Sequence, residues 1–275
     1  AFPSDVWVRN IIYGGDKFIA INCRSRSGNA AYSLDGINWV HMTMPSGYDY
    51  FEIVYGNDKF VTIGRESWEL GSKGKIFYSL DGITWTPITS SINFYYYDLA
   101  YGNGKFVATT DNGLAYSENG IDWTSTNTSA HAVNYCNDRF IALRISGGTS
   151  SIIYYSTDGI NWTNHGNIDG PFYSAVYGNG IFIMYGYGAV SPNKFIAYST
   201  DCVNWSRIDS PPFDNIIYCD NKFLGATSDA IYYSEDGINW HLTSTPSGIS
   251  LGSVAYGDGK FVATTYQNYS DVAIY

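Results

Sequence analysis

A six-residue motif of the form Tyr-Gly-x-x-Lys-Phe recurs seven times in this chain of 275 residues, and it restricts the possible folds more than any other feature. Successive motif tyrosines are 42, 46, 34, 42, 41 and 38 residues apart. A period near 40 residues, with several strands and tight turns in each unit, is typical of β-propeller blades. The copies are YGGDKF (13–18), YGNDKF (55–60), YGNGKF (101–106), YCNDRF (135–140), YGNGIF (177–182), YCDNKF (218–223) and YGDGKF (256–261).

The third repeat shows how one unit divides into strands. We name its strands a to d from the propeller axis outward, and we predict them at 94–102, 105–110, 113–117 and 121–127. The Gly-Asn-Gly and Asn-Gly stretches between them are typical of hairpin turns. The composition agrees, because 17% aromatic residues and 29 glycines describe many short strands joined by tight turns.

Seven a–b hairpins predict seven blades. The seventh repeat, however, stops at DVAIY (271–275), at the start of its strand c. We therefore predict an all-β fold, a β-propeller of four-stranded antiparallel blades, with seven blades of which the last is incomplete; six blades are the alternative. The prediction treats residues 1–275 as one propeller domain excised from a longer chain, so other domains of that chain are expected partners.

A second motif, Tyr-Ser-x-Asp-Gly-x-x-Trp, follows in six of the repeats. Its aspartate can accept backbone N–H groups in a tight turn, and its glycine supplies a positive φ. Asn119 replaces the aspartate in the third copy, and Cys202 replaces the glycine in the fifth. Chemistry that needs a carboxylate would not survive the first change, so we predict a structural role. The residues concerned are Asp35, Asp81, Asn119, Asp158, Asp201 and Asp236, with Trp39, Trp85, Trp123, Trp162, Trp205 and Trp240.

The second motif resembles a shortened Asp-box, or BNR repeat, of the kind found in sialidase-type and other propellers. Its pairing with YGNGKF-like units is similar to repeats of bacteriophage tail and bacterial surface proteins. The resemblance implies that the c–d turns, and with them the a–b turns, lie on the face opposite the ligand. It also implies an extracellular, cell-surface or virion-associated setting. Function is then expected on the other rim, which the b–c and d–a loops build.

The b–c loops differ from repeat to repeat and supply the candidate ligand contacts. Trp68 lies in the longest of them between Glu66 and Glu69, and an aromatic plate beside carboxylates suits a sugar face and its hydroxyl groups. Four arginines fall at the ends of predicted b strands. The candidate ligand-binding residues are Arg24, Arg26, Arg65, Trp68, Glu69, Arg144, Tyr185 and Tyr187.

Composition and spacing exclude several classes of function. The net charge of −10 and the pI near 4.6 are wrong for a nucleic-acid partner. No apolar run is long enough for a spanning helix, so membrane insertion is not expected. The four histidines lack metal-ligand spacing, and the glycine-rich turns lack the context of a phosphate cradle. We therefore predict no metal and no cofactor, and we expect the four cysteines to be free thiols.

Three functions remain. The preferred one is non-catalytic recognition of a glycan or other cell-surface ligand, such as a receptor, through the loop-rich rim. The first alternative is a sialidase-like glycoside hydrolase, in which Arg9 and the rim arginines would hold a substrate carboxylate and Glu52 would be the catalytic glutamate. The Arg-Ile-Pro signature of that family is missing at 8–11, and we predict that the protein is not an enzyme. The second alternative is a protein–protein interaction scaffold.

Overall fold

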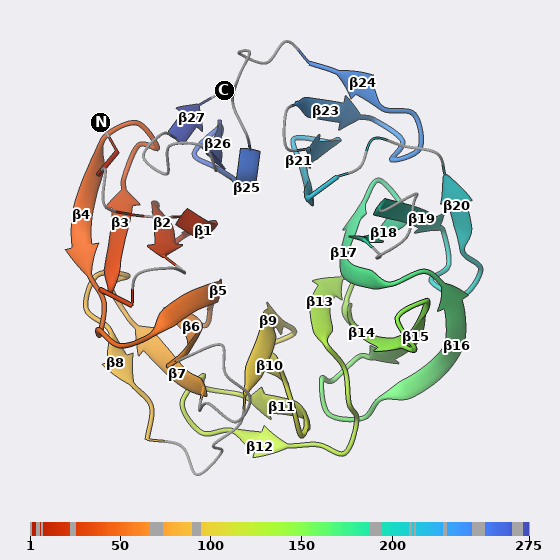
Figure 1. Ribbon diagram of the computed structural model, residues 1–275, viewed down its shortest axis with the longest axis horizontal. Coiled ribbons are helices and arrows are strands. Elements are labelled where there is room, and N and C mark those ends of the chain that lie inside the picture. The colour runs from red at the N-terminus through yellow and green to blue at the C-terminus, as the bar shows by residue number, and fades with distance from the viewer. Residues whose placement is uncertain are drawn as a thin grey trace.

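The protein is a β-propeller whose sheets surround a central axis (Figure 1). Within each sheet the first strand lies innermost, and consecutive strands pair antiparallel toward the outside. The computed structural model describes residues 2–3, 6, 8–22, 26–66, 74–89, 95–187, 194–208, 211, 213–227, 230–243, 251–265 and 272–274.

Within these described residues, six sheets have four strands each, and a seventh has three. The strands are β1 (Val8–Gly14), β2 (Lys17–Asn22), β3 (Asn29–Ser33) and β4 (Trp39–Thr43); β5 (Asp49–Gly56), β6 (Lys59–Arg65), β7 (Gly74–Ser79) and β8 (Thr86–Pro87); β9 (Tyr96–Gly102), β10 (Lys105–Thr110), β11 (Gly113–Ser117) and β12 (Thr124–Ser125); β13 (Ala132–Cys136), β14 (Arg139–Ser146), β15 (Ser150–Ser156) and β16 (Thr163–Asp169); β17 (Phe172–Gly178), β18 (Ile181–Tyr187), β19 (Lys194–Ser199) and β20 (Ser206–Ile208); β21 (Asn215–Cys219), β22 (Lys222–Ala226), β23 (Ile231–Ser234) and β24 (His241–Leu242); and β25 (Leu251–Gly257), β26 (Lys260–Thr265) and β27 (Val272–Ile274).

The predicted propeller of four-stranded antiparallel blades is confirmed, but the described residues form six blades and not the preferred seven. The seventh repeat contributes the three-stranded sheet β25-β26-β27, because its sequence stops before a second motif and a strand d. This sheet stands in the ring between β21 and β1 (Figure 1). Its Ala255 and Val262 pack into one apolar cluster with Val8 and Phe18.

The third repeat forms strands b and c at the predicted residues, whereas strand d is shorter than predicted. All seven a–b hairpins close through two residues with φ between 44° and 79°, which is the type I′ geometry that matches the twist of the paired strands. Glycine, asparagine and aspartate occupy these positions because they tolerate the left-handed region. The Gly/Asn/Asp pairs of the first motif therefore explain the hairpins directly.

The six boxes form one turn, as predicted. In the first box, Asp35 Oδ1 accepts the backbone N–H groups of Ile37 and Asn38 at 2.8 and 2.7 Å and the hydroxyl of Ser33 at 3.0 Å. The same three bonds are present in every other box. Cys202 stands at the glycine position with a φ of 65°, so the backbone conformation is kept even where the glycine is not.

The third box reverses one hydrogen bond. In the first box Asn38 Nδ2 donates to Asp35 Oδ2 at 2.7 Å. In the third box Asn119 Nδ2 donates instead to Asp122 Oδ2 at 2.8 Å, because the two residue types have exchanged places. The same turn is thus stabilised with the carboxylate on either side.

Neighbouring blades hold each other through the a–b turns and the boxes. Lys59 Nζ, from the second a–b turn, donates to the carbonyl oxygen of Asn119 in the third box at 2.7 Å. Asn103 Nδ2 likewise donates to the carbonyl oxygen of Thr157 in the fourth box at 2.9 Å. The a–b turns and the boxes therefore share one face of the ring, which we call the box face.

Motif tyrosines and glycines lock successive sheets together near that face. A methyl group at Gly102 would overlap the ring of Tyr135 in the next sheet. The same overlap occurs at Gly14, Gly56, Gly178 and Gly257, and at Gly257 the partner is Tyr13, so this contact also joins the three-stranded sheet to the first blade. Cys136 and Cys219 replace the glycine in the other two repeats.

The seam between the sixth blade and the three-stranded sheet is packed differently from the others. Its buried core consists of Ala226 and Ala263, with Ile231 and Val254 partly buried against them. The described residues there also line a cavity of about 360 Å³, and Cys219 is one of them. Elsewhere large buried phenylalanines and isoleucines fill the space between sheets.

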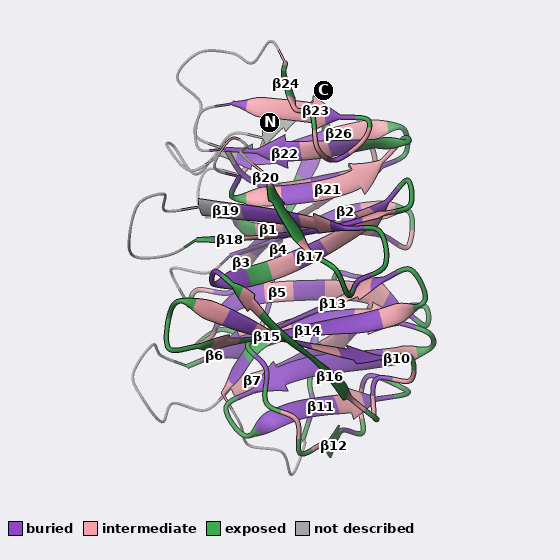
Figure 2. Ribbon diagram, turned by 90° about the vertical axis from the view of Figure 1, so that its right-hand side faces the viewer, coloured by how far each residue is buried: buried purple, intermediate pink, exposed green. Residues whose placement is uncertain are grey.

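Burial is greatest in the second strands, such as β2 and β10; the innermost strands β1 and β9 are partly exposed, and the outermost strand β16 is mostly exposed (Figure 2). Three cysteines, Cys136, Cys202 and Cys219, are free thiols, as expected; Cys23 lies outside the described residues. Within the described ranges, the chain contains no helix that is long and apolar enough to cross a membrane.

Candidate functional site: the central cavity

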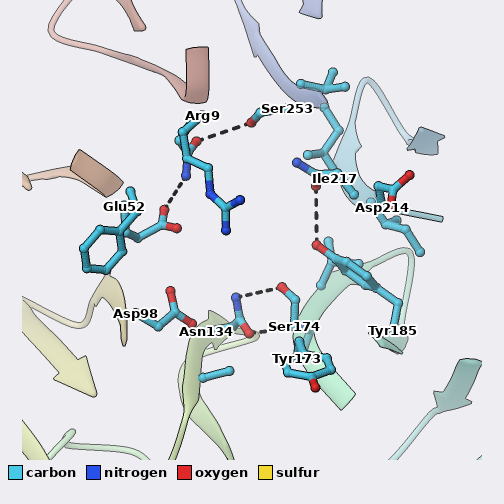
Figure 3. A pocket seen from close by; sticks show the side chains of 18 of the residues that line it. Arg9, Glu52, Asp98, Asn134, Tyr173, Ser174, Tyr185, Asp214, Ile217 and Ser253 are labelled. Atoms are coloured by element: carbon cyan, nitrogen blue, oxygen red, sulfur yellow. Dashed lines mark hydrogen bonds between the residues drawn. The ribbon is translucent and has the colours of Figure 1, made fainter. Parts of the chain in front are cut away.

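A cavity of about 780 Å³ occupies the axis of the propeller. The innermost strands of all six blades and of the three-stranded sheet contribute to its wall (Figure 3). Its lining comes mainly from the beginnings of these strands and from the end of β18, at Tyr185 and Tyr187. Each innermost strand ends in an a–b turn on the box face, so the cavity lies toward the opposite rim, where the b–c and d–a loops are.

The residues that line the cavity occupy fixed positions in each repeat. In every repeat, the residues four and three positions before the motif tyrosine line the cavity. We call these the outer and the inner column. The outer column is Arg9, Phe51, Tyr97, His131, Tyr173, Asp214 and Gly252, and the inner column is Asn10, Glu52, Asp98, Ala132, Ser174, Asn215 and Ser253.

β-Bulges explain how two consecutive residues can both line the cavity. In a regular strand, neighbouring side chains point to opposite faces. The pairing of β1 with β2, however, shifts between Val8 and Asn10 and leaves Arg9 without a partner residue. The register shifts in the same way at Phe51, Tyr97 and Tyr173. A bulge of this kind redirects a side chain, and here it adds four members of the outer column to the wall.

Hydrogen bonds between blades fix the inner column. Ser253 Oγ donates to Asn10 Oδ1 at 3.3 Å, and Asn10 Nδ2 donates to Glu52 Oε1 at 2.7 Å. Across the cavity, Asn134 Nδ2 donates to Ser174 Oγ at 3.3 Å, while Asn134 Oδ1 accepts the N–H of Ala175 at 2.8 Å (Figure 3). These contacts hold the polar groups in place, because each one joins two adjacent blades.

Tyr185 belongs to the same network, although it comes from a second strand. Its hydroxyl donates to Asn215 Oδ1 at 3.4 Å, across the boundary between the fifth and sixth blades (Figure 3). Burial raises the pKa of Tyr185, so the phenol stays protonated and keeps its hydrogen to donate.

Glu52 and Asp98 form a carboxyl pair on adjacent blades. Burial and the nearby charge of Asp98 raise the pKa of Glu52 well above its usual value. Burial also raises the pKa of Asp98, to about 7, although its oxygens accept the N–H groups of Val133 and Leu99 at 2.9 Å each. Arg9 acts in the opposite direction on Glu52. Both carboxyl groups therefore hold protons more tightly than an exposed acid would.

Exposed aromatic side chains flank the mouth of the cavity. Tyr173 and Tyr187 are stacked, with ring centroids 4.5 Å apart and planes 15° apart, and they are 37% and 57% exposed. Tyr97, which is 41% exposed, meets the edge of His131 at 6.0 Å. Exposed aromatic faces with polar groups behind them are suited to flat, partly polar ligands.

The predicted ligand residues fall in different places. Tyr185 and Tyr187 line the cavity. Arg144 is exposed but is not part of the lining, and Arg26 lies 3.4 Å from Asp49, outside it. Arg24, Trp68 and Glu69 are outside the described residues.

Arg65, another predicted ligand residue, does not line the cavity. Its side chain is 6% exposed, and its guanidinium lies 4.8 Å from the ring centre of Phe51 and 5.1 Å from that of Tyr95. It also donates to the Tyr95 hydroxyl. Stacking of this kind makes Arg65 a support behind the cavity wall rather than a ligand contact. The expected cluster of rim arginines is not found among the described residues, and Arg9 is the arginine that lines the cavity.

Sequence reasoning named Arg9 and Glu52, but only for the glycosidase alternative, and it missed the two columns to which they belong. Attention to the variable loops placed the site beyond the ends of the strands, whereas the wall is built from strand positions. The two columns vary from repeat to repeat at fixed offsets from the motif tyrosine. In the part of the chain that is described, no group of three or more histidine, cysteine or acidic side chains could hold a metal ion.

Comparison with known proteins defines the class of fold. No protein-family model and no curated protein sequence matches the chain. Among solved structures, it is similar to YCF48 from Cyanidioschyzon merolae, with a TM-score of 0.70 and 14% identity over 100% of this chain and 96% of that chain.

Two further structures are similar at 8% identity. One is the β-propeller domain of the Trilobed protease from Pyrococcus furiosus, with a TM-score of 0.65 over 100% of this chain and 93% of that chain. The other is an extracellular domain of a protein described as a one-component system from B. thetaiotaomicron, with a TM-score of 0.69 over 98% of this chain and 38% of that chain. At such low identity these likenesses show the β-propeller fold alone.

Proposed function

We propose that this protein is a non-catalytic recognition module that binds a glycan, or another polyhydroxylated cell-surface ligand, in its central cavity. The observation that carries the proposal is the wall itself. Every repeat contributes the same two positions to one cavity, but the residues at these positions differ. A shared scaffold with different side chains at its centre is the arrangement expected of a specific binding site.

The chemistry of the wall suits a sugar. Hydroxyl groups of a sugar both donate and accept hydrogen bonds, and the inner column offers amides, hydroxyls and carboxyls at fixed positions. The apolar faces of a sugar ring can pack on Tyr97, Tyr173 and Tyr187 at the mouth. The site is also rigid, because its polar groups are on strands rather than on loops.

The proposed setting is extracellular, on a cell surface or a virion. The similarity of the fold to an extracellular propeller domain is compatible with this setting. The resemblance of the paired motifs to repeats of phage tail and bacterial surface proteins favours it as well. Nucleic acid remains an unexpected partner, because the net charge is −10.

A glycan-array screen tests the proposal. The unmodified protein would be compared with Tyr173→Ala, which removes an aromatic face at the mouth, and with Leu242→Ala as a matched control. Leu242 is 63% exposed on the outermost strand β24, so its truncation changes exposed apolar surface away from the cavity. Selective binding to one glycan class, reduced in Tyr173→Ala and retained in Leu242→Ala, is the expected result.

Two outcomes of this screen would contradict the proposal. Binding that is lost in Leu242→Ala and kept in Tyr173→Ala would place the ligand outside the cavity. A blank array with folded protein would remove the glycan proposal and favour the protein–protein scaffold, which a pull-down would then examine.

A second candidate function, glycoside hydrolysis, is favoured by one observation. Glu52 and Asp98 are two carboxyl groups in the same cavity, and both have raised pKa values. A carboxylic acid that stays protonated near neutral pH can act as the general acid of a glycosidase. Hydrolysis of aryl glycosides that disappears in Glu52→Gln and in Asp98→Asn would support this candidate. Glycan binding without any turnover would leave recognition as the function.

A further inference from the structure

The carboxyl pair also bears on which sugars the cavity would select. Five groups in the lining can carry charge: Arg9, Glu52, Asp98, His131 and Asp214. Burial, followed by the nearby Arg144, lowers the pKa of His131, so the imidazole is neutral near pH 7. One positive group thus faces three acidic ones. The cavity is therefore poorly suited to an acidic glycan, which the sequence alone had left open.

One carboxyl oxygen of Glu52 is available in the cavity as a hydrogen-bond acceptor. Both of its hydrogen bonds, from Asn10 Nδ2 at 2.7 Å and from the N–H of Ile53 at 3.3 Å, end on Oε1. Among the described residues, Oε2 has no hydrogen-bond partner, and Figure 3 shows the carboxyl group turned toward the open centre. A deep carboxylate oxygen without a donor is a site for a donor on the ligand.

Asp98 stands on the neighbouring innermost strand at the equivalent position. Its two oxygens accept the backbone N–H groups of Leu99 and Val133, which fixes the orientation of the carboxyl group. Of the two outer-column residues on the same strands, Tyr97 is 41% exposed, whereas Phe51 is 7% exposed and is stacked on by Arg65. Two carboxyl groups near an exposed aromatic ring are surroundings that attract an organic cation.

Arg9 does not neutralise the pair by contact. In the described part of the chain it forms no ion pair within 4.0 Å, and its side chain is exposed in the cavity. Tyr185 is a protonated phenol and adds no charge. The two carboxyl groups are therefore not neutralised by a neighbouring positive charge. A cationic ligand can provide that charge.

We infer that the ligand presents a protonated amine to Glu52 and Asp98, so that the cavity prefers amine-bearing sugars to neutral or acidic ones. This inference rests on the proposed recognition function. The amine would donate to Glu52 Oε2 and to an Asp98 oxygen while its carbon neighbours pack against Tyr97. An opposite charge between two carboxyls favours their ionised forms, so binding should release a proton from the pair.

Two oligosaccharides that differ in one group provide the test. Glucosamine oligomers carry amines, and N-acetylglucosamine oligomers of the same length carry neutral amides. Calorimetric titrations at pH 6 would compare them on the unmodified protein, on Glu52→Gln and on Asp98→Asn, with Leu242→Ala as the control. We expect glucosamine oligomers to bind at least about tenfold more tightly, which is about 1.4 kcal/mol. Each carboxyl variant should remove this preference, and melting temperatures would show that the variants are folded.

Proton release is the second readout. Titrations in two buffers with different ionisation enthalpies should show that the amine oligomer displaces protons from the unmodified protein and fewer from Asp98→Asn. If the pair had only a structural role, replacing Asp98 would change the stability of the protein but not the number of protons released on binding.

The results separate the two proposals. Equal or tighter binding of the N-acetylated oligomer, or array hits that are neutral or acidic and depend on Tyr173, would overturn the amine inference and leave recognition intact. An absence of binding by either oligomer and by every glycan of the array would overturn both.

Discussion

The box face and the cavity wall are built from the same repeats, yet they differ in how much their residues vary. The boxes keep similar residues and one turn, whereas the wall positions carry different residue types. In the third box, Asn119 and Asp122 have exchanged residue types with respect to the other boxes, and the turn is unchanged. At the inner column, the repeats carry asparagine, glutamate, aspartate, alanine and serine at one position. The comparison teaches that positions kept alike serve the fold, whereas a strand position that carries five residue types over seven repeats marks the proposed site.

The largest effect is expected at the glycines that join successive blades. Gly102→Ala places a methyl group into the ring of Tyr135, and overpacking of this kind should lower the free energy of unfolding by about 3 kcal/mol. Urea denaturation would measure it. In a Tyr135→Ala background the same substitution should cost much less, because the overlapping atoms, Cγ and both Cδ atoms of the ring, are gone. Equal costs in both backgrounds would show that this contact does not hold the blades together.

A box should be weaker than such a glycine but still measurable. Asp158→Ala removes the acceptor for the N–H groups of Ile160 and Asn161, and we expect a loss of about 2 kcal/mol in the free energy of unfolding. The double variant Asp158→Asn, Asn161→Asp copies the third box and should recover most of this loss. A double variant as unstable as Asp158→Ala would mean that the box needs its carboxylate in one place, contrary to the comparison.

The pH dependence of stability should differ in sign between the two regions. In the boxes burial opposes ionisation, but hydrogen bonds from the backbone prevail and lower the pKa, to about 2 in Asp81. A lowered pKa stabilises the fold above the unfolded pKa near 3.8, and this contribution is lost as the pH falls toward 2. Asp98 has a raised pKa of about 7, so its neutral form favours folding, and that contribution is lost as the pH rises from about 4 to 7.

Urea titrations at several pH values would separate these contributions. The advantage of the unmodified protein over Asp98→Asn should shrink between pH 4 and 7, whereas its advantage over Asp81→Asn should shrink below pH 4. An Asp98 difference that grows with pH would contradict the raised pKa and the buried pair.

The smallest effect on stability is expected at the mouth of the cavity. Tyr173 is 37% exposed and stacks on Tyr187, so Tyr173→Ala should change the melting temperature by no more than a degree or two. The same variant is expected to reduce glycan binding by about tenfold, or about 1.4 kcal/mol. Large unfolding effects without any change in binding would assign this tyrosine to the scaffold.

Much of the fold could be predicted because its causes are local. The a–b turns need two residues with positive φ, and the pair Asn103 and Gly104 indicates one such turn in the sequence. The boxes need an acceptor and a glycine-like backbone, which the repeated motif supplies. The shared face of the turns and boxes also followed, and the bond from Lys59 to the carbonyl of Asn119 bears it out.

The cavity could not be predicted in the same way, because it depends on how seven innermost strands meet. Glu52 and Asp98 are 46 residues apart in the sequence, and their pairing follows from the ring. A register shift that no motif announces adds Arg9 and Tyr97 to the wall. The position of Arg65 at a strand end also gave no sign that Phe51 and Tyr95 would cover its guanidinium group.

The most direct test of the central claim is a crystal structure of the protein with the tightest-binding glycan of the array. The account predicts that the glycan occupies the central cavity, with a sugar ring on Tyr97 or Tyr173 and hydrogen bonds to inner-column residues such as Asn10 and Glu52. A glycan bound on the box face or on the outermost strands, with the cavity left to solvent, would contradict it.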